Sequence, residues 1–131
     1  MEKAYFNWSS GKDSALALYH AIRSEIYSVE TLFSLLKTHE DKIAMHEISG
    51  SLLKQQAEAI GIPLTIFKLD TRWHSADYES AMTEQMYEFR QQGITTALFG
   101  DLYLEDLRKN REANCRKAGI RAEFPLWGMP S

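Results

Sequence analysis

The sequence predicts an α/β fold of three layers, a parallel five-stranded sheet with helices on both faces. Short apolar runs alternate with amphipathic stretches along the whole chain, as expected for repeated strand and helix units. With 131 residues, 44% of them hydrophobic and 25% charged, the chain has the ordinary size and composition of one globular domain. We therefore expect a single domain over residues 1–131.

The expected strands are the apolar runs 4–8, 29–36, 64–69, 95–99 and 120–124. Between the first two runs lies a helix whose predicted apolar face is Ala15, Leu18, Tyr19 and Ile22, spaced i, i+3, i+4, i+7. A polar segment, 37–42, separates the second strand from the next helix.

Three more helices complete the expected pattern. One runs from about residue 46 to 60, and Gly61 with the following Pro63 ends it. The next follows a loop at 70–76 and ends at Gly93, and the last spans about 105–117 and ends at Gly119. The stripe expected to face the core of the third helix is Tyr78, Met82, Gln85, Met86 and Phe89.

Charge and cysteine content exclude several classes of protein. The net charge is -3, so no overall positive field attracts nucleic acid or an anionic membrane, and no nucleic-acid partner is expected. Cys115 is the only cysteine, which excludes an internal disulfide and favours a reducing cytoplasm. No run of 18 apolar residues occurs, so no membrane span is expected.

The loop after the first strand has the composition of an anion site. Ser9, Ser10 and Gly11 are small and precede a helix, whose first backbone N–H groups have no partner within the helix. Lys12 adds a positive charge, and Ser14 can cap the helix or donate its hydroxyl to a phosphate oxygen.

Two other interpretations of this loop have to be considered. The P-loop of nucleoside triphosphatases needs glycine where Phe6 stands and Ser or Thr where Asp13 stands, so that motif is absent. A plain strand-to-helix turn with a capping serine stays open on spacing alone. Asp13 likewise has two readings, as a helix cap or as a magnesium ligand near phosphates.

The last predicted helix is unusually polar. Arg108, Arg111, Glu112 and Cys115 form one row, which faces either solvent or a cleft. Cys115 has no partner cysteine for sulfur transfer, so a structural role is preferred to a nucleophilic one. In the loop after the third strand, Trp73 and His74 either flank a ligand or pin the loop.

The stretch Ser9-x-Gly11-x-Asp13-Ser14 resembles the PP-loop of the N-type ATP pyrophosphatases, which cleave ATP between its α and β phosphates. Residues 99–120, FGDLYLEDLRKNREANCRKAGI, and the later Phe124-Pro-Leu-Trp127 look like the signature block of the diphthine-ammonia ligase family. With Met45-His46 ahead of the second helix, the resemblance covers essentially the whole chain.

The resemblance implies a Rossmann-like fold of the adenine nucleotide α-hydrolase type and an AMP-forming ligase that uses ATP and Mg²⁺. A carboxylate on an acyl substrate, free or on a protein, would be adenylated and then attacked by ammonia. Implied nucleotide-binding residues are Ser9, Ser10, Gly11, Lys12, Asp13, Ser14, His46 and Gly100, with Lys12 and Asp13 catalytic. Implied substrate-binding residues are Asp101, Glu105, Asp106, Arg108 and Arg111, and Asp13 and Asp101 are the implied magnesium ligands.

The sequence departs from the family in two respects. Ser10 stands where related PP-loops often have glycine, and family members continue beyond the Pro-Leu-Trp segment into a region that helps to hold the acyl substrate. We therefore expect either a truncated or a naturally short form, and the alternative function is a nucleotide-binding module without ligase activity. Loss of that region is expected to expose residues 124–127, which a homodimer would cover.

Overall fold

Strands and helices alternate along the chain in the computed structural model. It describes residues 1–9, 12–39, 42–44, 50–70, 72–100 and 105–126, with the backbone alone for 37–39, 42–44 and 105–107. The elements are β1 (Glu2–Asn7), α1 (Lys12–Arg23), β2 (Tyr27–His39), β3 (Lys42–Ala44), α2 (Gly50–Ile60), β4 (Leu64–Asp70), α3 (Ser75–Gln91), β5 (Thr96–Leu98), α4 (Glu105–Lys117) and β6 (Arg121–Glu123).

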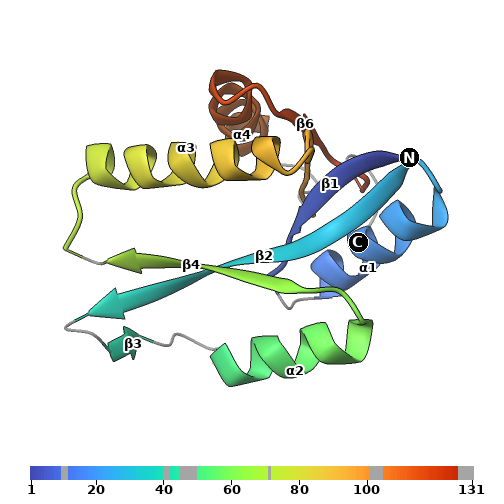
Figure 1. Ribbon diagram of the computed structural model, residues 1–131, viewed down its shortest axis with the longest axis horizontal. Coiled ribbons are helices and arrows are strands. Elements are labelled where there is room, and N and C mark those ends of the chain that lie inside the picture. The colour runs from blue at the N-terminus through green and yellow to red at the C-terminus, as the bar shows by residue number, and fades with distance from the viewer. Residues whose placement is uncertain (10–11, 40–41, 45–49, 71, 101–104, 127–131) are drawn as a thin grey trace.

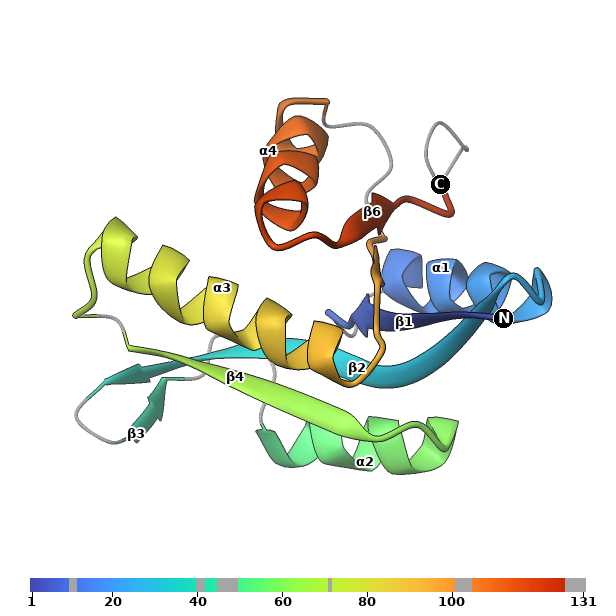
Figure 2. The same cartoon turned by 45° about the horizontal axis from the view of Figure 1, so that its top comes forward.

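Among the described residues, five strands form a parallel sheet in the order β4-β2-β1-β5-β6. Helices α3 and α4 cover one face and α1 and α2 cover the other, as Figures 1 and 2 show from two directions. The predicted three-layer α/β fold is therefore confirmed, with strand ends within a few residues of those expected.

The segment between the second strand and helix α2 differs from the prediction. Residues 37–42 were expected to be a polar connection, but β2 continues to His39 and forms an antiparallel hairpin with β3. Residues 32–38 of the long β2 pair with β4, and these backbone hydrogen bonds extend β2 into the polar segment that was expected to be a connection. Helix α2 is described from Gly50, so the start predicted near residue 46 lies outside the described residues.

The order of strands reverses between β1 and β5. From β1 the sheet grows through β2 to β4 in one direction, and the chain then returns to add β5 and β6 on the other side of β1. In an open α/β sheet, ligands bind at such a reversal, beyond the carboxyl ends of the two strands. The loops after β1 and β5 are therefore the first place to look for a site.

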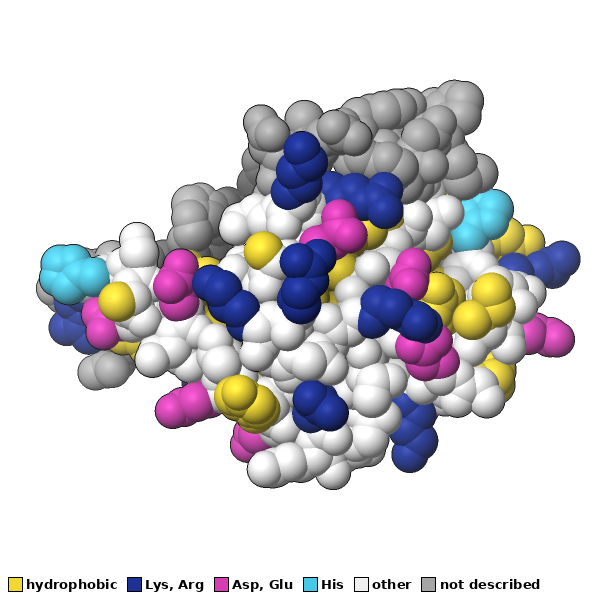
Figure 3. All heavy atoms as spheres, turned by 90° about the horizontal axis from the view of Figure 1, so that it is seen from above, with side chains coloured by type: hydrophobic (Ala, Val, Ile, Leu, Met, Phe, Trp, Pro, Cys, Tyr) yellow, Lys and Arg dark blue, Asp and Glu magenta, His cyan; other side chains and the backbone are white. Residues whose placement is uncertain are grey.

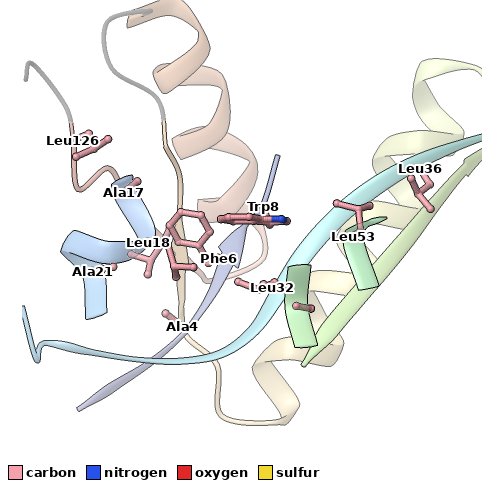
Figure 4. Packing of buried hydrophobic residues seen from close by; sticks show 12 residues of the cluster. Ala4, Phe6, Trp8, Ala17, Leu18, Ala21, Leu32, Leu36, Leu53 and Leu126 are labelled. Atoms are coloured by element: carbon pink, nitrogen blue, oxygen red, sulfur yellow. The ribbon is translucent and has the colours of Figure 1, made fainter. Parts of the chain in front are cut away.

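Helix α1 buries a different face from the one predicted. Its buried residues are Ser14, Ala17, Leu18 and Ala21, whereas Ala15, Tyr19 and Ile22 of the predicted face are exposed. Figure 4 shows the small residues of α1 beside the bulky side chain of Phe6 on β1. Small side chains let the helix approach the sheet closely, and this close packing outweighs the greater hydrophobicity of the opposite side.

Helices α2 and α3 end as predicted, and α3 also packs with the predicted stripe. Gly61 and Gly93 follow α2 and α3 with φ of +84° and +85°, in the left-handed region that only glycine adopts without strain. In α3, Met86 and Phe89 of the predicted stripe are buried, and the other three members are half-buried.

Phe124 and Leu126, which follow β6, pack into the core instead of forming an open surface. Leu126 is 0% exposed and joins the cluster around Ala17 and Phe6, and Phe124 is also buried. The expected exposure of residues 124–127 is therefore wrong at these two positions, and Trp127 lies outside the described residues. Within the described ranges, no helix has the length and apolar character to cross a membrane.

Candidate nucleotide site at the ends of β1 and β5

Trp8, the first residue after β1, is held by three hydrogen bonds. Its backbone N–H donates to the Phe33 carbonyl at 2.8 Å, and its carbonyl accepts from the Ser34 hydroxyl at 2.8 Å. Its indole N–H donates to Gln56 Oε1 on α2 at 2.9 Å. These bonds fix the direction in which the chain leaves the sheet toward residues 9–14.

The loop after β1 is closed by a bond from Ser9 to Ser14. The Ser9 backbone N–H donates to Ser14 Oγ over 3.2 Å, and Ser14 is buried. Because α1 begins at Lys12, Ser14 lies within the first turn instead of preceding the helix, so the predicted N-cap position is wrong. Its oxygen accepts the bond from Ser9, and the hydroxyl hydrogen is still able to donate.

The first turn of α1 carries the expected charges. Lys12 is exposed and Asp13 is half-buried at the helix start, whereas Ser10 and Gly11 lie outside the described residues. A helix N-terminus carries a partial positive charge and backbone N–H groups that point outward, and Lys12 adds a full positive charge. This end of α1 is therefore suited to an anion such as a phosphate.

Gly100 brings the loop after β5 against the same turn. A Cβ atom at Gly100 would lie 3.4 Å from Ser14 Cα and 3.6 Å from the Asp13 carbonyl oxygen. The side-chain amide of Asn7, the last residue of β1, donates to the Leu98 carbonyl at the end of β5 over 2.9 Å. Gly100, where the described part of the loop after β5 ends, therefore lies against the first turn of α1, and the carboxyl ends of β1 and β5 are bonded to each other.

The polar row of α4 packs on the aromatic ends of β5 and β6. Phe99 and Phe124 stack with ring centroids 5.2 Å apart, and the guanidinium groups of Arg111 and Arg108 lie over them at 4.8 and 4.9 Å. Arg108 also pairs with Glu112 at 3.2 Å. Both arginines are half-buried, so this face of α4 is neither a fully solvated surface nor an apolar core. Seen from the side of the molecule that carries α3 and α4, basic and acidic side chains are mixed with scattered hydrophobic ones (Figure 3).

Cys115, the last member of the row, is buried in the same core cluster as Tyr5. Burial raises the pKa of its thiol to about 11, and the Tyr5 hydroxyl and then Arg111 act in the opposite direction. Burial, followed by the effect of Cys115, raises the pKa of Tyr5 above its ordinary value. A buried, protonated thiol agrees with the structural role preferred from the sequence.

Trp73 and His74 are both tied to neighbouring structure. The Trp73 ring meets Phe67 edge-on with centroids 6.4 Å apart, yet 37% of Trp73 is exposed. His74 precedes α3 and forms a reciprocal cap with Asp77, whose carboxylate accepts the His74 backbone N–H at 3.0 Å. Trp73 therefore anchors its loop through the contact with Phe67, while part of its ring stays exposed to solvent.

Several predicted site residues cannot be placed in this arrangement. His46 and Asp101 lie outside the described residues, and Glu105 and Asp106 are described only as backbone in the first turn of α4. Within the described part of the chain, no group of three or more His, Cys, Asp or Glu side chains is arranged to hold a metal. Asp13 is the implied magnesium ligand whose side chain is described.

Sequence reasoning missed the residues that support the site. Asn7, Ser34 and Gln56 are polar side chains that bond to Leu98 or Trp8. The sequence holds one indication of these roles, because Asn7 and Ser34 are polar residues in or next to apolar runs that predict buried strands. A buried polar side chain needs a hydrogen-bond partner.

A shallow pocket lies at the other end of the sheet. It has a volume of about 340 Å³ and is lined by the end of α2 and the start of β4, among them Ala57, Ile62 and Leu64. At the same amino end, Glu2 accepts from the Thr96 hydroxyl and pairs with Arg121. This pocket is remote from the loops after β1 and β5 and is not part of the candidate site.

Comparison with known proteins agrees with the resemblance seen in the sequence. The family model described as the diphthamide synthase N-terminal domain matches residues 2–122, which include all the strands except the end of β6. No match is found among the curated proteins.

Proposed function

The chain belongs to the diphthamide synthase N-terminal domain family, and on this premise we propose that it is an ATP-dependent, AMP-forming ligase. The family match is consistent with a PP-loop ATP pyrophosphatase domain that uses ATP. The finer proposal is amide formation, since diphthamide is an amide, with ammonia as the nitrogen donor and a carboxylate on a small molecule or a protein as the acceptor.

One observation carries the proposal. Gly100, which follows β5, lies against the first turn of α1, which follows β1, at the reversal of strand order. This is the position at which open α/β sheets bind nucleotides. The start of α1, which is suited to an anion, and Lys12 lie at the same position.

The proposed nucleotide site comprises Ser9, Ser10, Gly11, Lys12, Asp13, Ser14, His46 and Gly100. Lys12 and the helix start would neutralise the charge that grows on the phosphate oxygens, which is the main barrier to this reaction. Asp13 and Asp101 are the proposed ligands of Mg²⁺, which would supply further positive charge to the phosphates. Arg108 and Arg111, with Asp101, Glu105 and Asp106, are proposed to hold the acyl substrate, because guanidinium groups bind carboxylates and phosphates.

The proposed reaction has two steps. A carboxylate oxygen attacks the α-phosphorus of ATP, the bond between the α and β phosphates breaks, and pyrophosphate leaves. Ammonia then attacks the acyl carbon of the adenylate, the bond from carbon to the phosphate oxygen breaks, and AMP leaves with the amide formed. The proton lost by the nitrogen passes to solvent or to a neighbouring base.

A calorimetric titration of Mg-ATP into the chain tests nucleotide binding. Lys12→Ala removes a charged hydrogen bond worth about 1.5–3 kcal/mol, so we expect a Kd raised roughly 10- to 100-fold. Lys3→Ala is the matched control, since Lys3 is also an exposed lysine but lies at the amino end of β1. Equal binding by the Lys12→Ala and wild-type chains would contradict the proposed site.

Measurement of AMP and pyrophosphate separates the ligase from its alternative. Release of both products from ATP in the presence of a carboxylic acid, lost in Lys12→Ala, supports the enzyme. Tight binding with neither product would assign the chain to the non-catalytic nucleotide-binding modules. Release of ADP and inorganic phosphate would contradict both proposals.

A further inference from the structure

Trp8 is buried between α1 and α2, just before the loop that is proposed to bind phosphate. Only 7% of the residue is exposed, and Figure 4 shows its ring between Leu18 of α1 and Leu53 of α2. All three residues belong to one core cluster. A ring enclosed in this way offers no face on which a nucleotide base could stack. Trp8 therefore contributes to the site through the position of its backbone.

The far end of the Trp8 side chain is bonded to α2. Its indole N–H donates to Gln56 Oε1 at 2.9 Å. Gln56 is half-buried beside the buried Leu53 and Ala57, whereas its neighbour Gln55 is exposed. An indole N–H is a donor only, so it needs an acceptor wherever it is buried. Gln56 supplies this acceptor from a helix whose described residues include none of the implied nucleotide-binding residues.

A continuous path leads from Gln56 through Trp8 to the first turn of α1. The peptide unit that joins Trp8 to the next residue is bonded through both of its polar groups. Its carbonyl, that of Trp8, accepts from the Ser34 hydroxyl at 2.8 Å. Its N–H, that of Ser9, donates to Ser14 Oγ at 3.2 Å. A displacement of the Trp8 side chain moves this peptide unit, so the first turn of α1 is positioned in part from α2.

We propose that Gln56 is a positioning residue for nucleotide binding. It fixes Trp8 through the indole, and Trp8 fixes the peptide unit that precedes the phosphate-binding loop. The inference rests on the proposed function, because that function assigns the loop after β1 to the phosphates of ATP. Gln56 acts without touching the nucleotide, so its effect on affinity should depend on the indole N–H of Trp8.

Calorimetric titration of Mg-ATP into matched pairs of variants tests this role. Gln56→Met keeps the length of the side chain but removes the acceptor, so the Kd should rise roughly three- to tenfold, as for one lost neutral hydrogen bond. Gln55→Met makes the same change at the exposed neighbouring position and should leave the Kd unchanged. Gln56→Glu keeps an acceptor and should retain the wild-type Kd, with Gln55→Glu as the control for the added charge.

A double-mutant cycle shows whether Gln56 acts through Trp8. Trp8→Phe keeps an aromatic ring but removes the indole donor, so it should raise the Kd at least as much as Gln56→Met. In the chain that already carries Trp8→Phe, the further change Gln56→Met should not alter the Kd, because the bond is already lost.

Urea denaturation of each variant measures stability separately, and the titrations are made at a temperature at which every variant is folded. A purely structural bond would lower the free energy of unfolding in Gln56→Met but leave the Kd of the folded chain as in the wild type. That result would overturn the inference. An unchanged Kd in Trp8→Phe, which removes the same bond from its other side, would overturn it as well.

Two further results have distinct meanings. If Gln56→Met raised the Kd equally in the wild-type chain and in the Trp8→Phe chain, Gln56 would act without Trp8, and the inference would be wrong. Failure of the wild-type chain to bind Mg-ATP would contradict the proposed function, and the inference with it.

Discussion

The side-chain amide of Asn7 donates to the main-chain carbonyl of Leu98 at 2.9 Å, and this bond joins the ends of two strands that lie 91 residues apart in the sequence. Both residues immediately precede segments of the candidate site. With the ladder between β1 and β5, the bond therefore holds the segment that leads to Lys12 beside the segment that leads to Gly100.

Replacing Asn7 with Ala leaves the Leu98 carbonyl without this donor. We expect the free energy of unfolding to fall by about 1 kcal/mol and the affinity for Mg-ATP to fall as well, because the two loops lose their link. Urea denaturation and calorimetric titration measure the two effects. Asn110→Ala, at an exposed position on α4, should change neither, and equal behaviour of the two variants would contradict a role for Asn7.

Ser34 supports the nucleotide loop from β2. Its buried hydroxyl donates to the Trp8 carbonyl, so Ser34→Ala should leave that carbonyl unpaired and cost about 1–3 kcal/mol of stability. Chemical denaturation checks this value, and Ser51→Ala at an exposed position of α2 is the comparison. A loss no larger than that of Ser51→Ala would mean that the Trp8 carbonyl finds another donor.

Gly100 and Gly61 should respond differently to substitution. A methyl group at Gly100 would touch the first turn of α1, so Gly100→Ala should weaken Mg-ATP binding slightly and Gly100→Val more strongly. Gly61 has no atom within 4 Å of the added carbon but a φ of +84°, so Gly61→Ala should cost about 1 kcal/mol of stability without changing nucleotide affinity. Calorimetric titration and thermal unfolding of all three variants test this difference. Mg-ATP binding weakened as much by Gly61→Ala as by Gly100→Val would contradict it.

Alkaline pH should destabilise the protein through Cys115. Its pKa is 9.0 in an unperturbed thiol and about 11 in the fold, so between these values the unfolded chain releases a proton that the folded chain keeps. The free energy of unfolding should therefore be unaffected by this group below about pH 9 and should fall above it by up to roughly 1.4 kcal/mol per pH unit.

Urea denaturation of the wild type and of Cys115→Ala between about pH 8 and 10 measures this contribution. Tyr5, whose ordinary pKa is 10.0 and is also raised by burial, adds its own decline mainly above that range in both proteins. Identical slopes for the two proteins would show that the thiol does not titrate differently in the fold.

The fold was largely predictable because its elements are encoded locally. Gly61 and Gly93 indicate helix ends because the backbone there has a positive φ, which favours glycine, and the apolar runs indicate the strands. The face of α1 was not predictable from hydrophobicity, since Tyr19 and Ile22 make the exposed side more apolar than the side with Ala17 and Ala21. Close packing against the sheet decided the orientation, and that depends on residues distant in sequence.

Part of the candidate site was likewise predictable from the sequence and part was not. The composition of residues 9–14 indicates an anion-binding loop without any knowledge of the fold. The roles of Asn7 and Ser34 depend on which carbonyl each side chain meets, and those partners, Leu98 and Trp8, are distant in the chain. A sequence marks such residues as polar in an apolar context but does not specify their partners.

The reversal of strand order also divides the sheet mechanically. The ladder between β1 and β5 joins three residue pairs, whereas β1 and β2 share six and β2 and β4 share seven. The β1–β5 ladder is therefore shorter than either of those two ladders and equal to the β5–β6 ladder, which also joins three pairs. It ends at the loops of the candidate site. A ligand that contacts the loops after both β1 and β5 would oppose local separation of these strands. Ligand binding should therefore slow amide hydrogen exchange in β5 and β6.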